Sequence, residues 1–468
     1  MGAGKSTIGA QAAKRIGRAF VDLDREIEAR AGDTIPVIFE SWGEAAFREI
    51  EEEAALEGLS AREPKVIALG GGALGAESTR QLLRERAITV HVDVDPRIAW
   101  SRVRDGDRPL AQDEEAFRRL YAERQPVYEE VADVVTRSVD DVVLAAGGIH
   151  VRVGSLELLG ELLPGDGPAA LVADAHVAGI HGADAQLALG RRLASTHSVP
   201  PGEDAKTAAV CERLWHELRL DRKGTVVALG GGTTSDVTGF VAATFLRGVA
   251  WAAVPTTLVA QVDAAVGGKT AIDLPSGKNL VGAFHWPVRT VIDPALLETL
   301  PESERRAGLA EVVKTGLLAG EPFWELPDAE LVRSCALFKT AVCLRDPHDR
   351  GERAVLNLGH TFAHALEAAA GYEELTHGSA VALGLRAALG LSVEHLGLDA
   401  AVADQVESVL APQPARVDLE RAWDALGRDK KAEGGRVRLV LLEAPGKPVR
   451  GVELPDEDVR RALAALVA

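Results

Sequence analysis

The chain has 468 residues, of which 47% are hydrophobic and 26% are charged, and this composition is typical of globular domains with buried cores. At roughly 150 residues per domain, the length predicts about two to four domains. The 52 Lys and Arg residues against 70 Asp and Glu residues give a formal net charge of -18, which argues against nucleic acid or an anionic membrane as the main partner.

The cysteines and the apolar runs indicate a reducing compartment and no membrane anchor. Cys211, Cys335 and Cys343 lack the CxxC spacing of zinc sites and are too few for a disulfide framework. The first residues are glycine-rich and polar, unlike a secretory signal, and no apolar run is long enough to cross a bilayer. We therefore expect a cytoplasmic protein that acts on small molecules.

Helical and strand-like patterns alternate along the first part of the chain, up to about Val135. Such alternation is typical of an α/β domain with a parallel sheet. Helices are expected over 8–16, 35–59 and 117–131, and strands over 19–23, 66–69 and 88–94. The small, glycine-rich segment 145–148 is expected to be a linker, so the first domain is predicted over 1–144.

A second α/β pattern follows the predicted linker and then gives way to a helix-rich part. Strands are expected over 150–153, 170–173, 225–229, 250–254 and 289–292. After Leu300, helices are expected over 304–318, 330–344 and 360–370. The sequence therefore predicts a nucleotide-binding α/β domain over 149–300 and a mostly helical domain over 301–468.

Gly2-Ala3-Gly4-Lys5-Ser6-Thr7 opens the first predicted helix with a fragment of a phosphate loop. Backbone N–H groups at such a helix start hold phosphates, the lysine reaches the β and γ phosphates, and the hydroxyl of Ser6 would bind Mg²⁺. The complete pattern needs a further glycine five positions before Gly4, which precedes Met1. On this fragment alone, a glycine-rich tail remains the alternative.

Several motifs follow the phosphate loop in a fixed order. A lone arginine among them would be a surface charge, but together they resemble the shikimate kinase family over nearly the whole segment. The motifs are Asp22 and Asp24 after a strand, Gly43-Glu44 before Phe47-Arg48 and Glu51, Gly70-Gly71-Gly72 after another strand, Arg108-Pro109-Leu110, and Arg124 before Gln125-Pro126-Val127-Tyr128.

This resemblance implies a role for each matching residue. Gly4, Lys5, Ser6 and Thr7 would bind ATP, with Ser6 and Asp22 at its Mg²⁺. Paired guanidinium forks suit a carboxylate, and neutralisation of charge on the transferring phosphoryl group is a usual task of an arginine. Shikimate would be bound by Asp24 at its hydroxyls, Arg48 and Arg124 at its carboxylate and Gly71 and Gly72 at its ring, with Arg108 on a closing lid.

The phosphate loop departs from the family in one respect. Shikimate kinases have an apolar strand before this loop, usually the central strand of the sheet, and no such strand precedes Gly2 in this sequence. Met1 is the only methionine and falls where the family often has an internal one. We therefore expect an internal start codon or a truncation, and a weakened kinase half.

The strand expected over 225–229 ends in Gly230-Gly231-Gly232, and Asp236 follows. Asp174 ends an earlier strand, and 201–206 forms a polar turn. An acid after a strand can bind ribose hydroxyls, although ordinary turn chemistry would also explain each of these features. A nucleotide site at the ends of these strands is one interpretation.

The stretch 254–287, VPTTLVAQVDAAVGGKTAIDLPSGKNLVGAFHWP, places Lys269 and Lys278 on glycine-flanked turns, with Asp263 and Asn279 beside them. Lysine is almost never fully buried unless it is paired, and glycine allows close approach of backbone to a ligand. Two solvated loop lysines are the plain interpretation. A pocket for a multiply charged anion is the alternative that the rest of the chain favours.

The run Asn357-Leu358-Gly359-His360-Thr361-Phe362-Ala363-His364 places two histidines four residues apart on one helical face. His377 follows, and Glu311 lies on another predicted helix. Two histidines and a carboxylate are a common catalytic zinc set. Spacing alone allows both His360 and His364 to be ligands, and it also allows a helix-face pair with an unrelated loop histidine.

Together the motifs of the second half resemble the 3-dehydroquinate synthase family, from about His150 to the C-terminus. They are Arg247-Gly248-Val249, the stretch 254–287, Leu309-Ala310-Glu311-Val312-Val313-Lys314, Arg353, the double-histidine run and Asp429-Lys430-Lys431. The resemblance implies a site between the α/β and helical domains. It also implies that NAD, which is not consumed, and a divalent metal, Zn²⁺ or Co²⁺, turn 3-deoxy-D-arabino-heptulosonate 7-phosphate into 3-dehydroquinate.

The resemblance also assigns individual residues. Glu311, His360 and His377 would bind the metal, and His364 would contact the substrate phosphate. The substrate would further contact Lys269, Asn279, Lys314, Lys339, Arg353, Asn357, one of Lys430 or Lys431, and Arg247, with Asp263 orienting groups at the reacting carbon. NAD would be held by Asp174, Glu203, Lys206, Gly231, Gly232, Thr233, Asp236, Thr256, Thr257 and Lys278. Thr234-Ser235, Ala363 and Ser379 depart from the family, and we expect them to tune the site without abolishing it.

The sequence thus predicts a bifunctional enzyme with two non-consecutive steps of the shikimate pathway, and a homodimer through the synthase half. Another sugar phosphate cyclase is the main alternative for the second half, although Lys339 and Asn357 favour dehydroquinate synthase. A structural or regulatory phosphate-loop domain is the alternative for the first half. An iron-dependent polyol dehydrogenase would leave the density of lysines unexplained.

Overall fold

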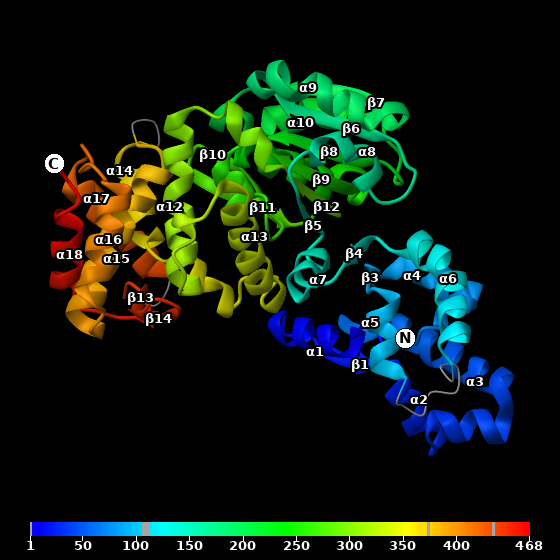
Figure 1. Cartoon of the computed structure of the whole chain (residues 1–468). Helices are drawn as coiled ribbons and strands as arrows, with labels where there is room; N and C mark the ends of the chain where they lie inside the picture. The colour runs from blue at the N-terminus through cyan, green and yellow to red at the C-terminus, as the bar shows by residue number, and fades with distance from the viewer. Residues whose placement is uncertain (1, 105–112, 372–374, 433–435) are drawn as a thin grey trace. The chain divides into compact units, whose positions relative to one another are not determined.

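The computed structural model describes residues 2–104, 113–371, 375–432 and 436–468, without the side chains of 428–432. The chain forms two compact units, Met1–Gly148 and Ile149–Ala468 (Figure 1). They are called the N-terminal unit and the C-terminal unit below. Among the described residues, no helix combines the length and the apolar character needed to span a membrane.

The N-terminal unit contains two separate pairs of parallel strands. β1 (Ala19–Asp22) pairs with β2 (Lys65–Ala68), and β3 (Val90–Val92) pairs with β4 (Val134–Thr136). Within the described residues, no hydrogen-bonded strand joins β2 to β3. The strands of this unit therefore form two separate two-stranded sheets. Most of their residues are only half-buried, so the helices cover these sheets incompletely.

Seven helices surround these strands in the described part of the N-terminal unit. α3 is broken at Gly43, whose φ of 83° and ψ of 169° are not helical. The main core lies where α2 packs on α3, around Leu23, Ile27 and Phe47. The helices are α1 (Lys5–Arg15), α2 (Leu23–Ala31), α3 (Ile35–Ser60), α4 (Glu77–Arg86), α5 (Pro96–Val103), α6 (Glu114–Val131) and α7 (Val139–Ala146).

The C-terminal unit is built on a six-stranded parallel sheet with the order β5-β12-β9-β8-β6-β7. All residues of β6 and β8 are buried, because helices cover both faces, as expected of a parallel sheet. The strands are β5 (Ile149–Val151), β6 (Ala169–Asp174), β7 (Leu193–Val199), β8 (Thr225–Gly230), β9 (Ala250–Pro255) and β12 (Arg289–Ile292).

Alternate residues of these strands face two different helical layers. The even-numbered residues of β6 and β8 pack with α10 (Ala208–Glu217) and α11 (Gly232–Thr244). The odd-numbered residues pack with α8 (Leu159–Leu162) and α9 (Ala175–Leu189). The hairpin of β10 (Lys269–Leu274) and β11 (Gly277–Phe284) lies against α11.

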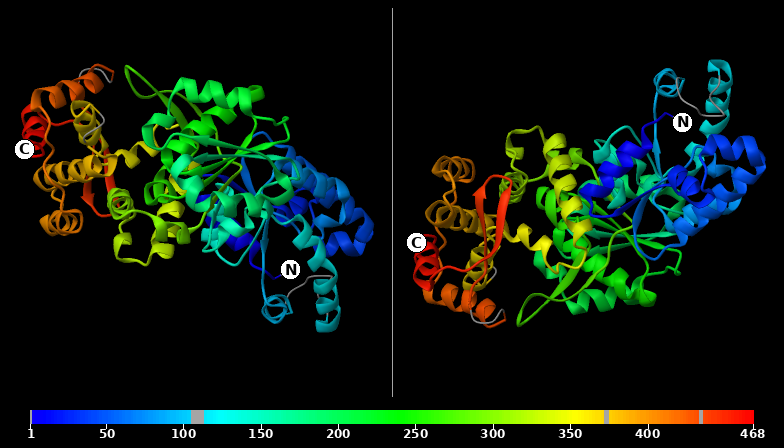
Figure 2. Two further views of the ribbon diagram at one scale, coloured as in Figure 1. Left: turned by 90° about the horizontal axis from the view of Figure 1, so that it is seen from above. Right: turned by 90° about the horizontal axis from the view of Figure 1, so that it is seen from below.

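The rest of the C-terminal unit is mostly helical, with one pair of antiparallel strands, and packs around α15 (Figures 1 and 2). α12 and α13 lie between the sheet and the later helices, and both contact the turn 260–264 that follows β9. The elements are α12 (Glu302–Ala319), α13 (Asp328–Arg345), α14 (His360–Ala369), α15 (His377–Leu396), α16 (Ala400–Leu410), α17 (Leu419–Ala432), β13 (Leu439–Ala444), β14 (Lys447–Val452) and α18 (Asp456–Ala464).

The predicted fold class is confirmed, and three local expectations need correction. Lys269 and Lys278 lie in the strands β10 and β11 and not on turns. The expected linker 145–148 begins inside α7, which continues to Ala146 because three small or apolar residues extend its buried face. The strand expected over 88–94 spans only Val90–Val92.

Candidate active sites

Three side chains with metal-binding groups meet in the C-terminal unit. Glu311 lies in α12 and is fully buried, while His360 and His377 begin α14 and α15. Nε2 of His360 lies 3.4 Å and Nε2 of His377 lies 3.2 Å from Oε1 of Glu311. The three candidate ligand atoms are within 4.8 Å of one another. The fold therefore brings together the three predicted ligands from distant parts of the chain.

His364 stands apart from this set. Its ring meets that of His360 edge-on, with the ring centroids 5.5 Å apart. Among the described residues, Glu311 has hydrogen bonds or ion pairs with His360 and His377 and none with His364. Of the two histidines on one helical face, the structure turns only His360 toward the carboxylate.

The second ring nitrogen of each candidate ligand has its own acceptor. Nδ1 of His360 lies 3.3 Å from the carbonyl oxygen of Leu358. Nδ1 of His377 lies 3.3 Å from Oε1 of Glu367, a buried residue of α14. Metal-binding histidines usually donate their second N–H to such acceptors. The residues thus fit a divalent metal, and Glu367 had no role in the sequence prediction.

A lysine-rich cluster adjoins the three candidate ligands. Asp263 lies in a π-helical turn, η6 (Ala260–Ala264), a conformation that is frequent at functional sites. Its Oδ1 is 2.8 Å from Nζ of Lys339 and 3.5 Å from Nζ of Lys314. Nζ of Lys314 is in turn 2.5 Å from Oε2 of Glu311. Both lysines are buried, so a line of alternating charges connects the turn to the candidate metal site.

The charges of this cluster control its ionisation. Burial would raise the pKa of Asp263, but Lys314 and Lys339 outweigh it and lower the pKa to about 2. For Lys314 the directions are reversed. Burial would lower its pKa, but the negative charges of Asp263 and Glu311 raise it above its ordinary value. Asp263 therefore stays ionised near neutral pH and acts as a counterion for the two ammonium groups.

The other residues predicted at the substrate are only partly gathered at this cluster. Arg353 is buried and donates from NH1 to the carbonyl oxygen of Gly267 at 2.9 Å, and Lys269 forms an ion pair with Asp349. Arg247 and Asn357 are exposed, and within the described part of the chain neither has a hydrogen bond or ion pair to the cluster. Lys430 and Lys431 lie in α17, but their side chains are outside the described residues.

The glycine turn after β8 leaves the start of α11 open. Gly231 precedes the helix and supplies no side-chain cap. A Cβ at Gly232 would lie 2.9 Å from Cβ of Ala264, so the turn has no room for a side chain there. The hydroxyl of Thr256 is buried beside this edge without a hydrogen-bond partner among the described residues. Free N–H groups and an unpaired hydroxyl fit the phosphates of a dinucleotide.

The remaining predicted cofactor residues form a polar network. Lys206 is buried, its Nζ lies 2.8 Å from Oδ2 of Asp236, and it also contacts Oδ1 of Asn279. Burial raises the pKa of Asp236 to about 6, against the opposing effect of Lys206. Asn279 therefore lies with the predicted cofactor residues, although it was expected at the substrate. Asp273, which had no predicted role, holds Asn279 by accepting from its backbone N–H at 2.7 Å.

Five other predicted cofactor residues, Lys278, Glu203, Asp174, Thr257 and Thr233, have local partners or positions in this part of the unit. Nζ of Lys278 is 3.1 Å from Oε1 of Glu203. Asp174 accepts from the N–H groups of His176 and Val177 at 2.8 and 3.1 Å and so caps α9. The hydroxyl of Thr257 accepts from the N–H of Ala260, and Thr233 lies in the first turn of α11.

The residues predicted for shikimate form one cluster in the N-terminal unit. Nζ of Lys5 is 3.8 Å from Oδ2 of Asp24, and Arg48 forms ion pairs with Glu44 and Glu51. A Cβ at Gly72 would lie 2.0 Å from NH1 of Arg48, so a side chain at this position would displace the guanidinium of Arg48. Burial raises the pKa of Glu51, and Arg48 opposes that shift.

Other kinase residues frame this cluster. Tyr128 donates from its hydroxyl to the carbonyl oxygen of Gly71 at 2.6 Å, and Arg124 lies one turn earlier on α6. Asp22 caps α2 by accepting from the N–H of Asp24 at 3.1 Å. Gly4 precedes α1 in a left-handed conformation, with a φ of 86°, and Ser6 and Thr7 lie in the first turn. Arg108 lies outside the described residues.

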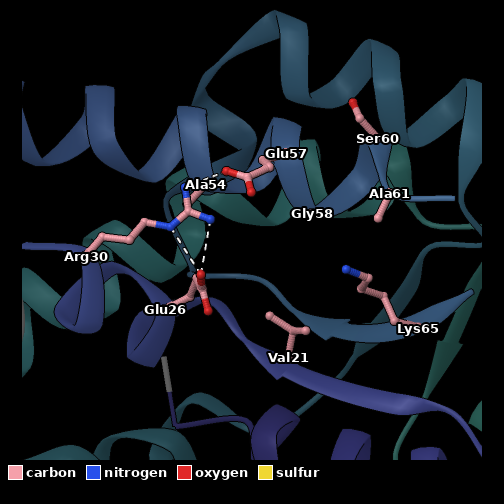
Figure 3. Close-up of a pocket in the computed structure, with 9 residues that line it drawn as sticks. All are labelled: Val21, Glu26, Arg30, Ala54, Glu57, Gly58, Ser60, Ala61 and Lys65. Carbon is pink, nitrogen blue, oxygen red and sulfur yellow. Dashed lines mark hydrogen bonds and ion pairs between the residues drawn. The ribbon is translucent and has the colours of Figure 1, made fainter. Parts of the chain in front are cut away.

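A cavity of about 410 Å³ lies elsewhere in the N-terminal unit (Figure 3). Arg30 projects between Glu26 and Glu57 and forms an ion pair with each of them in the cavity wall. None of the predicted site residues lines it. The cavity is therefore separate from the candidate kinase site.

Comparison with known proteins assigns both units of the chain to families. The family model for shikimate kinase matches residues 1–146, and those for the N-terminal and C-terminal parts of 3-dehydroquinate synthase match 196–307 and 308–432. The 3-dehydroquinate synthase of Bordetella pertussis (strain Tohama I) is 41% identical over 341 residues, which are 67% of this chain and 95% of that protein.

Solved structures share the fold of the C-terminal unit. A 2-deoxy-scyllo-inosose synthase complexed with carbaglucose-6-phosphate, NAD⁺ and Co²⁺ has a TM-score of 0.61 at 24% identity, over 68% of this chain and 96% of that one. The same values describe the 2-epi-5-epi-valiolone synthase of Streptomyces hygroscopicus with NAD⁺ and Zn²⁺ bound. The chain belongs to the 3-dehydroquinate synthase family and carries a shikimate kinase domain ahead of its synthase domains.

Proposed function

We propose that the C-terminal unit converts 3-deoxy-D-arabino-heptulosonate 7-phosphate to 3-dehydroquinate and phosphate, and that the N-terminal unit phosphorylates shikimate with ATP. The observation that carries the first proposal is that Glu311, His360 and His377 lie beside two buried lysines. A phosphorylated acid needs clustered positive charge, and Lys314 and Lys339 supply it where water is largely excluded.

The cofactors proposed are NAD and Zn²⁺ or Co²⁺ for the synthase and Mg²⁺ with ATP for the kinase. Two imidazoles and a carboxylate suit a divalent metal with open positions, and the uncapped start of α11 suits a pyrophosphate. Support also comes from relatives of the same fold, one described with NAD⁺ and Co²⁺ and another with NAD⁺ and Zn²⁺.

When bound, the metal would supply a Lewis acid and NAD a hydride acceptor that later returns the hydride. The chain's own groups would hold the substrate anion. Lys314, Lys339 and Arg353 would bind its phosphate and carboxylate, and Asp263 would hold both lysines in place as their shared counterion. Few acid–base groups are needed, since the departing phosphate can itself accept the neighbouring proton.

In the kinase unit, Lys5 and Ser6 would hold the ATP phosphates and Mg²⁺ at the start of α1, with Asp22 at the metal's water shell. Asp24, Arg48 and Arg124 would bind shikimate in front of the glycine turn 70–72. Arg108 would neutralise charge on the transferring phosphoryl group. Phosphoryl transfer requires mainly positioning and charge stabilisation, which these residues can provide.

The synthase proposal is tested by the NAD balance of the reaction. Purified protein, metal, the heptulosonate phosphate and NAD at a tenth of the substrate concentration should give complete conversion, with phosphate released and no accumulation of NADH absorbance. Stoichiometric NADH would instead favour a dehydrogenase, and the proposal would then be abandoned.

Another sugar phosphate cyclase activity is the second candidate, because two such enzymes share the fold at 24% identity. The 41% identity to a 3-dehydroquinate synthase along 95% of its length favours the first. Assays of phosphate release with glucose 6-phosphate, sedoheptulose 7-phosphate and the heptulosonate phosphate would separate them. Only the last should react at an appreciable rate.

A further inference from the structure

Glu367 is a buried acid on α14, seven residues after His360 and so on nearly the same helical face. Only 5% of it is exposed. Buried carboxylates are rare unless they are paired. Its partner is His377, the candidate ligand that begins the next helix, and Oε1 of Glu367 lies 3.3 Å from Nδ1 of that ring.

The ring of His377 lies between two carboxylates. Its Nε2 is 3.2 Å from Oε1 of Glu311, and its Nδ1 faces Glu367. An ionised carboxylate can only accept hydrogen bonds, so Nδ1 must donate to Glu367. When the imidazole is neutral, this leaves the lone pair on Nε2, which points toward the other two candidate ligand atoms.

The two histidines of the site are held differently. The side chain of His360 is 12% exposed and has a neutral carbonyl oxygen behind Nδ1. The side chain of His377 is 40% exposed, so packing restrains it less. A carboxylate behind the ring restrains its orientation and also makes the opposite nitrogen a stronger donor to a metal.

We propose that Glu367 is a positioning residue of the metal site, which fixes the orientation and tautomer of His377. This inference rests on the proposed function, since it takes Glu311, His360 and His377 as the ligands. Glu367 itself lies outside the group of ligand atoms that are close enough to share one ion. Its role is therefore to hold a ligand, and its loss should weaken metal binding without abolishing it.

The test compares Zn²⁺ affinity by chelator competition in the full-length wild type, Glu367→Gln, Glu367→Ala and Glu311→Ala. Replacement of such outer carboxylates typically costs about 10–100-fold in metal affinity. We expect the alanine variant to fall in that range, and the glutamine variant to lose less, because it keeps an acceptor oxygen. Glu311→Ala should lose bound metal altogether.

Glu394→Gln is the matched control. Glu394 belongs to the second group of acids and histidine, with His395 and Asp458, but its carboxylate pairs with Arg461 at 2.7 Å. This variant should keep wild-type metal affinity and stoichiometry.

Two further measurements separate positioning from a structural role. In Glu367→Gln, the visible spectrum of the Co²⁺-loaded protein and the ¹⁵N shifts of the His377 ring should both change. The metal-free form of this variant should still unfold cooperatively, which shows that its fold is intact. Wild-type affinity and an unchanged Co²⁺ spectrum in both Glu367 variants would overturn the inference while leaving the proposed function standing. Full metal in Glu311→Ala would instead overturn the ligand assignment on which both rest.

Discussion

At the scale of single residues, two histidines that have equivalent positions in the sequence pattern have different positions in the site. His360 and His364 share a helical face, yet only His360 approaches Glu311, at 3.4 Å. We predict that His360→Ala loses bound metal and synthase activity together. His364→Ala should keep a full equivalent of metal by elemental analysis while its turnover falls. Equal loss of metal in both variants would show that both histidines are ligands.

Asp236 should give the C-terminal unit a measurable pH dependence. Burial raises its pKa to about 6, from an ordinary value of 3.8. Between these values the folded protein binds more protons than the unfolded chain. The contribution of Asp236 to the free energy of unfolding is therefore fully present below about pH 4 and lost as the pH rises through 6, by on the order of 1–3 kcal/mol.

Asp236→Asn should remove this contribution. The gap between wild-type and variant free energies of unfolding, from urea titrations between pH 4 and 7.5, should change by the amount given above. Asp404→Asn, at an exposed position of α16, is the control. Curves for the wild type and Asp236→Asn that stay parallel over this range would contradict the prediction.

The family resemblance predicted the candidate ligands, but the partners that hold them emerge only from the fold. Glu311 and His377 are 66 residues apart, and no local pattern measures the distance between them. Glu367 did leave a signal, since an acid seven residues after a candidate ligand lies on nearly the same helical face and needs a partner if it is buried. Asp273 left none, because an aspartate before a turn is ordinary in any sequence.

At the scale of elements, buried strands were predicted well and exposed ones poorly. β6, β8 and β9 are continuous apolar runs under helices on both faces, and such runs are visible in the sequence. β11 is mostly exposed and contains Gly277, Lys278, Asn279 and Gly282, which are turn-like residues. Its strand conformation depends on pairing with β10, which is a tertiary interaction and not a local preference.

At the start of α11, an added side-chain atom should disturb the proposed NAD site. A methyl group at Gly232 would lie 2.9 Å from Cβ of Ala264, so the turn that faces the proposed pyrophosphate must shift. We predict that Gly232→Ala weakens NAD binding at least tenfold, measured by calorimetry. Gly179→Ala is the control, because Gly179 lies within α9 with nothing within 4 Å of its added methyl.

That control should also behave in a defined way by itself. Alanine at an unobstructed helix position stabilises by about 0.5–1 kcal/mol relative to glycine. Gly179→Ala should therefore raise the unfolding midpoint slightly and leave the NAD affinity unchanged. If Gly232→Ala also kept wild-type NAD affinity, the turn would not be the dinucleotide site.

At the scale of the whole molecule, the chain joins two units with different degrees of internal cover. The strands β6 and β8 of the C-terminal unit are buried throughout, whereas those of the N-terminal unit are mostly half-buried. Domains with separate cores can differ in stability, so the two activities need not be lost together.

The gap between β2 and β3 leads to a prediction about the kinase activity of the sequence as printed. Backbone groups along these two edges lack strand partners within the described residues, and each costs about 1–3 kcal/mol where it is buried. A domain is stable by only about 5–15 kcal/mol. A few such groups therefore suffice to destabilise the unit and misplace Lys5 at the start of α1.

We therefore predict that the printed sequence forms dehydroquinate at a normal rate but phosphorylates shikimate slowly or not at all. Fusion of an apolar segment that ends in glycine ahead of Gly2 should supply a strand between β2 and β3 and restore kinase activity, measured by coupled ADP release with shikimate. Lys5→Met in the extended protein should abolish that activity and leave the synthase rate unchanged. Equal, robust kinase rates from the printed and extended forms would mean that the two-piece sheet already positions the phosphate loop, because α1 packs on β1 and β2 without a central strand.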